Sequence, residues 1–182
     1  MQKYFEKIPG ERLFLSPINP DDCELYAKWF NDPAVMIGLG DYSSVFSLLG
    51  QRKYLEEKAS NRVEQNYAIV LREGERLIGN ISLRDVGQKD GTATLGLFIG
   101  EEADRGCGYG AEAIRLILGY GFDTLRLHNI QLKVFADNLN AIACYEKVGF
   151  KEFGRRREAK FIRGRYVDVV HMDILDREFL AR

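Results

Sequence analysis

The chain has 182 residues, 46% of them hydrophobic and 29% charged, and its 26 basic side chains nearly balance 27 acidic ones. This composition is typical of a globular protein, so we expect one domain over residues 1–182. The near-neutral charge argues against direct nucleic-acid binding. No stretch approaches the roughly 18 consecutive apolar residues of a membrane span, and the amino terminus lacks the apolar core of a secretory signal, so we expect a cytoplasmic protein without membrane contact. The 3 cysteines and 2 histidines have no short ligand spacing, so neither a metal site nor a disulfide framework is expected.

The first third of the chain predicts one strand and two helices. The apolar run "ERLFLSPI" (11–18) favours a strand. The segment "NPDDCELYAKWFND" (19–32) favours a helix that is opened by Asn19 or Asp21. A second helix is expected within residues 44–60.

Three short apolar runs follow, at 66–73, 76–86 and 92–100. Turn signals separate them, "EGE" between the first two and "KDG" before the third. This pattern predicts an antiparallel meander.

The pattern then changes to a helix over 108–125, a buried strand over 129–137, a helix over 138–150 and a long hairpin over 151–175. An antiparallel meander that is followed by a helix–strand–helix crossover forms a mixed sheet covered by helices. The predicted fold class is therefore α+β.

A glycine-rich stretch, "DRGCGYGA" (104–111), stands where the helix over 108–125 begins. The first N–H groups of a helix have no intrahelical partner, and the helix dipole places partial positive charge there. Glycines let an anion approach the backbone closely, and Arg105 adds a cation with planar donors. The stretch therefore predicts an anion site, best suited to a diphosphate, although a plain structural turn is the alternative.

Three templates compete for this stretch. "GCGYGA" satisfies the dinucleotide pattern G-x-G-x-x-A, but the acid that ends the next strand, Asp137, comes about ten residues later than that motif requires. A nucleotide-triphosphatase loop is excluded because no Gly-Lys-Ser or Gly-Lys-Thr follows the glycines. Arg105, Gly108 and Gly110 stand in the order R-x-x-G-x-G, which resembles the signature of the GNAT superfamily of acetyltransferases, whose loop holds the pyrophosphate of coenzyme A.

A second segment, "NLNAIACYEKVGF" (138–150), resembles the later GNAT motif, in which Asn opens a helix and Tyr lies near its middle. Asn138 and Tyr145 are about two turns apart, so they share one helix face. The alternative is that Asn138 or Asn140 only caps the helix and Tyr145 only packs in the core. More loosely, "KWFNDPAV" and "LIGNISLRDV" are similar to the branch that contains ribosomal-protein N-terminal and spermidine acetyltransferases.

The resemblance implies a mostly antiparallel sheet of about 6–7 strands with helices on both faces, acetyl-CoA as co-substrate, and no metal. It also implies that the strand over 92–100 separates from the strand over 129–137, which frees backbone groups for the coenzyme. The coenzyme-binding residues that it implies are Leu97, Phe98, Ile99, Arg105, Gly106, Cys107, Gly108, Tyr109, Gly110, Asn138 and Asn140.

The implied reaction is attack of a primary amine on the acetyl thioester through a tetrahedral intermediate. A backbone N–H near Leu97 and Phe98 would stabilise the oxyanion. Tyr145 is the expected proton donor to the leaving thiolate, because a phenol with a pKa of about 10 is protonated at neutral pH.

The base is not identified by the sequence. Many relatives carry Glu where this chain has Thr94, and a threonine cannot accept the proton. Either the amine arrives neutral or another group acts through water, for which the candidates are Asp85, Glu102, Asp168 and His171. A covalent route through Cys144 is disfavoured, because a cysteine on an apolar helix face is usually inert.

The acceptor amine is also open: a protein N-terminus, a polyamine and an amino sugar all fit. Acids in the first third, Asp41, Glu56 and Glu57, are expected to be solvated rather than to attract a cationic amine. The basic run "GRRRE" (154–158) is expected to be a solvated edge, with contact to the 3′-phosphate of coenzyme A or a homodimer surface as alternatives. A module that binds acyl-CoA without turning it over, as a sensor, is the alternative to an enzyme.

Overall fold

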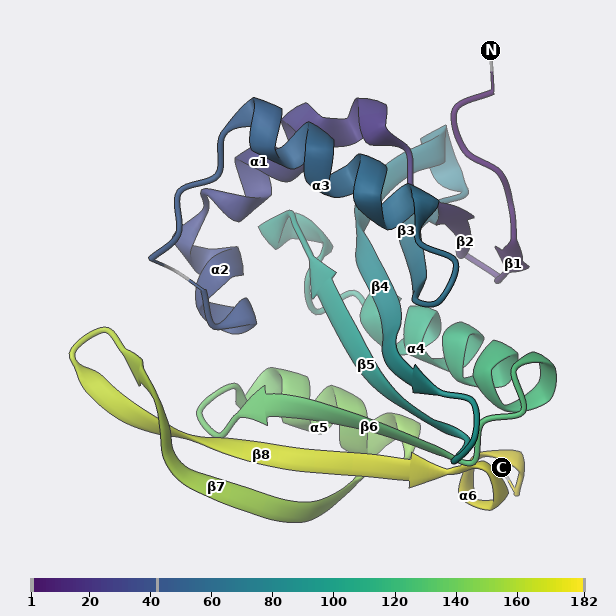
Figure 1. Cartoon of the computed structure of the whole chain (residues 1–182), viewed down its shortest axis with the longest axis vertical. Coiled ribbons are helices and arrows are strands. Elements are labelled where there is room, and N and C mark those ends of the chain that lie inside the picture. Colours follow the sequence, from purple (N-terminus) through teal and green to yellow (C-terminus); the bar gives the residue numbers. More distant parts are fainter. Residues whose placement is uncertain (1, 42, 182) are drawn as a thin grey trace.

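The computed structural model describes residues 2–41 and 43–181. Its centre is an eight-stranded sheet in the order β1-β2-β3-β4-β5-β6-β8-β7 (Figure 1). All neighbours are antiparallel except β5 and β6. The predicted α+β class is confirmed, and the sheet is larger than predicted because of the two-residue strand β1 (Ile8–Pro9), which the sequence pattern is too short to reveal.

The remaining strands follow the predicted runs closely. They are β2 (Leu13–Pro17), β3 (Gln65–Leu71), β4 (Arg76–Gly87), β5 (Thr92–Ile99), β6 (Asn129–Phe135), β7 (Lys151–Ile162) and β8 (Arg165–Leu175). The helices are α1 (Cys23–Phe30), α2 (Pro33–Leu39), α3 (Leu48–Ser60), α4 (Tyr109–Gly119), α5 (Leu139–Val148) and α6 (Asp176–Leu180).

The helix predicted over 19–32 is present as α1, and a further helix begins directly after that range. Asp32 accepts a hydrogen bond from the Ala34 N–H and so caps a new helix, α2, whose first residue is Pro33. Proline suits the first position of a helix but cannot continue the preceding one. The second helix, α2, which forms part of the site, was therefore not predicted.

Helices cover both faces of the sheet (Figure 1). On one face, α4 and α5 pack against alternate strand residues such as Ile81, Leu95 and Ile130, all buried. On the other face, α1 and α3 pack a second core that includes Trp29 and Leu55. Alternate residues of a strand point to opposite faces, so each central strand contributes to both layers.

The parallel neighbours β5 and β6 pair over a short distance only. Their register runs from Thr92 opposite Asn129 to Thr94 opposite Gln131 and then stops. Beyond Thr94 the two strands diverge (Figure 1). The separation implied by the resemblance is therefore present, and it leaves the edge of β5 beyond Thr94 without a neighbouring strand.

Among the residues that the structure describes, no helix has the length and apolar character needed to cross a membrane.

Candidate active site

A cleft of about 1060 Å³ opens where β5 and β6 separate. Its wall is built from α2, β5, β6, α5, the end of β4, and the loop and first residues of α4, together with single residues of β7 and β8. Two motifs that the sequence singled out, at 104–111 and at 138–150, therefore meet in one cavity.

The glycine-rich loop has the backbone that an anion site needs. Gly106 and Gly108 have φ angles of 77° and 82°, in the left-handed region that side chains disfavour. Gly108 is the N-cap of α4, so the first N–H groups of that helix face the loop without intrahelical partners. At Gly110, a side-chain carbon would touch Leu97, which keeps α4 close to β5.

Arg105 is committed to the end of β5. Its Nε donates to the Ile99 carbonyl at 3.1 Å and its Nη2 to the Gly100 carbonyl at 2.6 Å. These bonds satisfy strand carbonyls that have no β6 partner, and they fix the loop on the strand. Arg105 lines the cleft, and besides its positive charge it provides the hydrogen bonds that hold the loop to the end of β5.

A contact that the sequence pattern does not reveal holds the loop from behind. Glu112 of α4 accepts hydrogen bonds from the Arg12 backbone N–H and from Arg12 Nε, both at 2.8 Å. Arg12 also donates from Nη1 to the Cys107 carbonyl at 3.0 Å and lies over the Tyr109 ring. The partners are 100 residues apart in the chain, so no local signal predicts the pairing.

Asn138 and Tyr145 lie on α5 as the spacing predicts. The Asn138 side chain accepts a hydrogen bond from the Ala141 N–H at 3.2 Å, so it caps the helix while it lines the cleft. The Tyr145 ring packs edge-on against Phe150, with ring centroids 5.9 Å apart. Burial raises the pKa of Tyr145 to about 12, so its hydroxyl keeps its proton at any physiological pH.

All the other predicted binding residues line the cleft except Cys107. The Cys107 side chain is exposed, and its Sγ faces the carbonyls of Ala103 and Arg105. That Leu97, Phe98 and the other predicted binding residues contact a coenzyme stays a prediction.

The structure separates the candidate bases. Of the four, Asp85 lines the cleft, as does Thr94, and Glu102, Asp168 and His171 are not part of its wall. Asp168 accepts a hydrogen bond from the Glu158 N–H instead. Asp85 is exposed, at a position of positive φ where β4 bulges away from β5.

Cys144 also lines the cleft. Burial raises the pKa of its thiol, which disfavours the thiolate that a covalent route requires.

Trp29 of α1 joins the helices over one face to the loop beyond β5. Its indole lies against Gly100 so closely that a side-chain carbon there would come within 2.0 Å of the ring. Its Nε1 donates to Glu101 at 2.9 Å, and its ring packs edge-on against Phe98 of β5. Only glycine fits at position 100.

Several cleft residues were not singled out from the sequence. They are contributed by α2, β4, β5, β6, β7 and β8, and include Val35, Leu39, Arg84, Gly96, Lys133, Phe135, Lys160 and Val169.

Comparisons with known proteins agree with this geometry. A family model described as "Acetyltransferase (GNAT) domain" matches residues 12–151. The spermidine N(1)-acetyltransferase of Vibrio cholerae is 31% identical over 175 residues, which cover 95% of this chain and 92% of that protein. A ribosomal N-acetyltransferase-like protein of Bacillus subtilis, YdaF, is 31% identical over 103 residues, 57% of this chain and 56% of its own.

Among solved structures, the spermidine N-acetyltransferase of Vibrio cholerae in complex with CoA and spermine matches with a TM-score of 0.85 and 27% identity, covering 93% of this chain and 98% of that one. The match extends over almost the whole sheet and its helices. The predicted resemblance is confirmed: the chain belongs to the GNAT family of N-acetyltransferases.

Proposed function

We propose that the protein transfers an acetyl group from acetyl-CoA to a primary amine, with Tyr145 as the proton donor to the departing sulfur. The observation that carries the proposal is the cleft itself. The divergence of β5 from β6 brings the open edge of one strand, the glycine loop and Tyr145 into a single cavity. The related structure with bound CoA supports the choice of coenzyme.

The residues present fit such a coenzyme. Gly106 and Gly108 leave the backbone bare at the start of α4, where a diphosphate would accept hydrogen bonds from free N–H groups. Lys147 and Asn140, further along the wall, lie on the same helix as Tyr145. The edge of β5 from Leu97 to Ile99 offers backbone groups to an extended, amide-containing arm.

The chain's own groups then act as follows. A backbone N–H of β5 near Leu97 or Phe98 stabilises the negative charge that forms on the carbonyl oxygen when the amine nitrogen attacks. The carbon–sulfur bond breaks, and the sulfur takes the proton of the Tyr145 hydroxyl. The proton lost by the attacking nitrogen passes through solvent and restores the phenol, so the products are an amide and a thiol.

Thiol release from acetyl-CoA tests the proposal. The protein is supplied with pools of N-terminal peptides, polyamines and amino sugars, and Tyr145→Phe is run beside it. We expect one pool at least to release thiol, and we expect the Phe variant to be slower by about 10²–10³-fold, the usual range for loss of a general acid.

Binding of acetyl-CoA, measured by calorimetry, is the control in both proteins. If acetyl-CoA binds and no pool releases thiol above the level of Tyr145→Phe, the protein is a sensor of acyl-CoA rather than an enzyme.

A further inference from the structure

The side of the cleft that faces α2 carries unpaired positive charge. Thr94 alternates along β5 with Ala93 and Leu95, which are buried against α4 and α5, so Thr94 points to the opposite face of the sheet. Arg84 is its register partner on β4 and shares that face. We call the residues of this face that line the cleft the acceptor half, because the coenzyme motifs lie on the other face.

Two lysines complete the acceptor half. Lys133 is two residues from Phe135 on β6, and Phe135 packs with Ile37 of α2. Lys160 of β7 stands opposite Val167 of β8, which belongs to the same small cluster. Lys133, Lys160 and Arg84 all line the cleft and are exposed.

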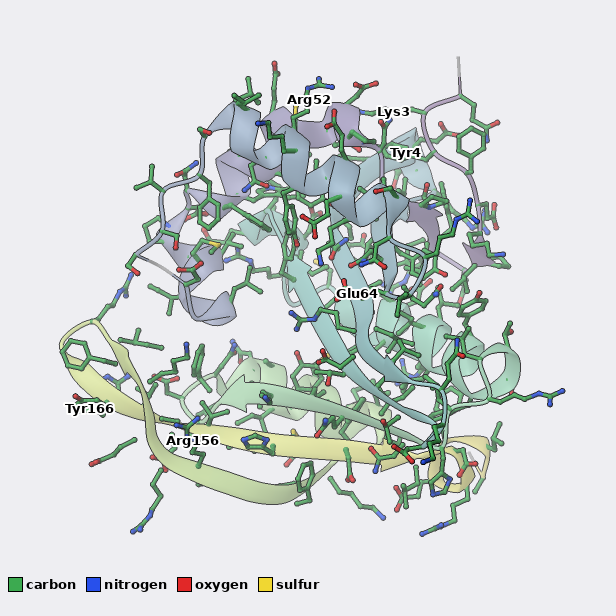
Figure 2. The ribbon with its side chains drawn as sticks, in the orientation of Figure 1. Lys3, Tyr4, Arg52, Glu64, Arg156 and Tyr166 are labelled. Carbon is green, nitrogen blue, oxygen red and sulfur yellow. The ribbon has the colours of Figure 1, made fainter. Side chains whose placement is uncertain are left out.

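None of the three cations is within ion-pair or hydrogen-bond distance of a carboxylate in the part of the chain that the structure describes. Of the described residues, two acids line the cleft: Asp85, which is exposed, and Asp104, which is paired with Arg76. Glu64, labelled in Figure 2 beside the ribbon of β4, is already bonded to Lys58 at 2.8 Å.

The acids that the sequence offered as attractants for a cationic amine lie elsewhere. Asp41, Glu56 and Glu57 are exposed, as expected, and none is part of the cleft wall. The position where many relatives carry Glu is Thr94, which has no charge.

The Arg84 guanidinium lies over Gly96, in space that a side chain at that position would fill. A side-chain carbon at Gly96 would lie 3.0 Å from Arg84 Nη2 and 3.4 Å from Cζ, so the guanidinium rests on the β5 backbone there. Leu97 and Phe98, where the oxyanion donor is placed, are one and two residues further along. At the rise of a strand, this separation is about 3–7 Å.

We propose that the acceptor amine carries an anionic group, a carboxylate or a phosphate, which binds Arg84 with support from Lys133 and Lys160. This inference rests on the proposed acetyl transfer and narrows its substrate. A guanidinium presents paired donors that match either anion. A polyamine would instead bring ammonium groups against three cations that form no ion pair within the described residues, of which Arg84 alone has a carboxylate, Glu64, near enough for its charge to act on it.

The same charges bear on the missing base. Positive charge beside a bound amine disfavours its protonated form. The bound anionic group offsets the charge of Arg84, so the charges left to favour the neutral amine are those of Lys133 and Lys160.

Matched acceptors test the inference within each class of amine. For small amines the set is 4-aminobutanoate, butylamine and 1,4-diaminobutane, which share a four-carbon chain. For amino sugars it is glucosamine 6-phosphate against glucosamine, and for N-termini a pair of tetrapeptides that differ only in glutamate or lysine at the second position. The anionic amino sugar carries a phosphate and the anionic small amine carries a carboxylate, so the two sets also show which of these anions is preferred. We expect kcat/KM to be at least tenfold higher for the anionic member in the class that is turned over.

Arg84→Glu supplies the second measurement. We expect it to lower kcat/KM for the anionic acceptor by at least tenfold and to raise it for the cationic one, while acetyl-CoA binding changes by less than about twofold. Lys89→Gln is the matched control, because Lys89 is exposed in the turn before β5 and outside the cleft wall; it should leave every ratio unchanged.

The two proposals fail in different ways. Turnover of the cationic member at least as fast as the anionic one, or an Arg84→Glu variant with unchanged preference, overturns the anionic acceptor but leaves acetyl transfer standing. Bound acetyl-CoA with no turnover of any acceptor overturns acetyl transfer itself.

Discussion

The hydroxyl of Tyr145 combines a good position with a strongly held proton. Burial against Phe150 raises its pKa to about 12, well above that of a free phenol. A side chain that titrates so high is protonated throughout the range in which the enzyme can be assayed. It is therefore always able to donate, although each transfer to a thiolate is less favourable than from an ordinary phenol.

This shift predicts the alkaline side of the pH profile. We expect kcat/KM for a neutral-amine acceptor to show no loss below about pH 10, because Tyr145 keeps its proton there. The measurement is initial rate against pH for the wild type and Tyr145→Phe. An alkaline decline with a midpoint at or below about 10, present in the wild type and absent from the Phe variant, would show that the phenol is not shifted upward.

The start of α4 is the element on which coenzyme binding is expected to depend. Gly108→Ala forces a side chain into a φ of 82°, which costs about 1–2 kcal/mol, and places a carbon 3.4 Å from Arg12 Nη2. We expect a lower free energy of unfolding in urea and weaker acetyl-CoA binding.

Gly154→Ala is the control, because Gly154 lies in β7 with no atom within 4 Å of the added carbon and no positive φ. Equal stability and equal coenzyme affinity in the Gly108 and Gly154 variants would mean that the loop adapts without cost.

Local sequence patterns were sufficient to predict most helices and strands but not the residues of the acceptor half. The meander, α4, β6 and α5 follow from periodicity, turn residues and two motifs, because each signal lies within one segment. The α2 helix was missed because a run that starts at a proline looks like the end of a helix. Arg84, Lys133 and Lys160 gave no signal, since strand pairing between distant segments is what places them on one face.

At the scale of the whole molecule, the contact between Arg12 and Glu112 ties the amino-terminal strands to the helix behind the site. Partial burial acts to raise the pKa of Glu112, but hydrogen bonds from Arg12 outweigh it, and the net pKa is lowered. A carboxyl whose folded pKa is lowered stabilises the protein above its unfolded pKa, and this contribution is lost as the pH falls through the folded value.

We therefore expect Glu112→Gln to be less stable than the wild type at neutral pH, by about 1 kcal/mol. The difference should shrink at acid pH, below the lowered folded pKa of the Glu112 carboxyl, where the wild-type carboxyl is protonated as well. Urea midpoints at the two pH values measure the effect. Glu57→Gln, at an exposed position on α3, should differ from the wild type at neither pH; a constant deficit for Glu112→Gln would assign its role to shape rather than charge.

Trp29 is the single tryptophan of the chain, and its indole bridges α1 to the residues between β5 and the glycine loop. Any ligand that shifts that loop must change the surroundings of the one fluorophore excited at long ultraviolet wavelengths. We therefore expect a ligand that moves the loop to change the tryptophan fluorescence, which gives a label-free reporter of that movement.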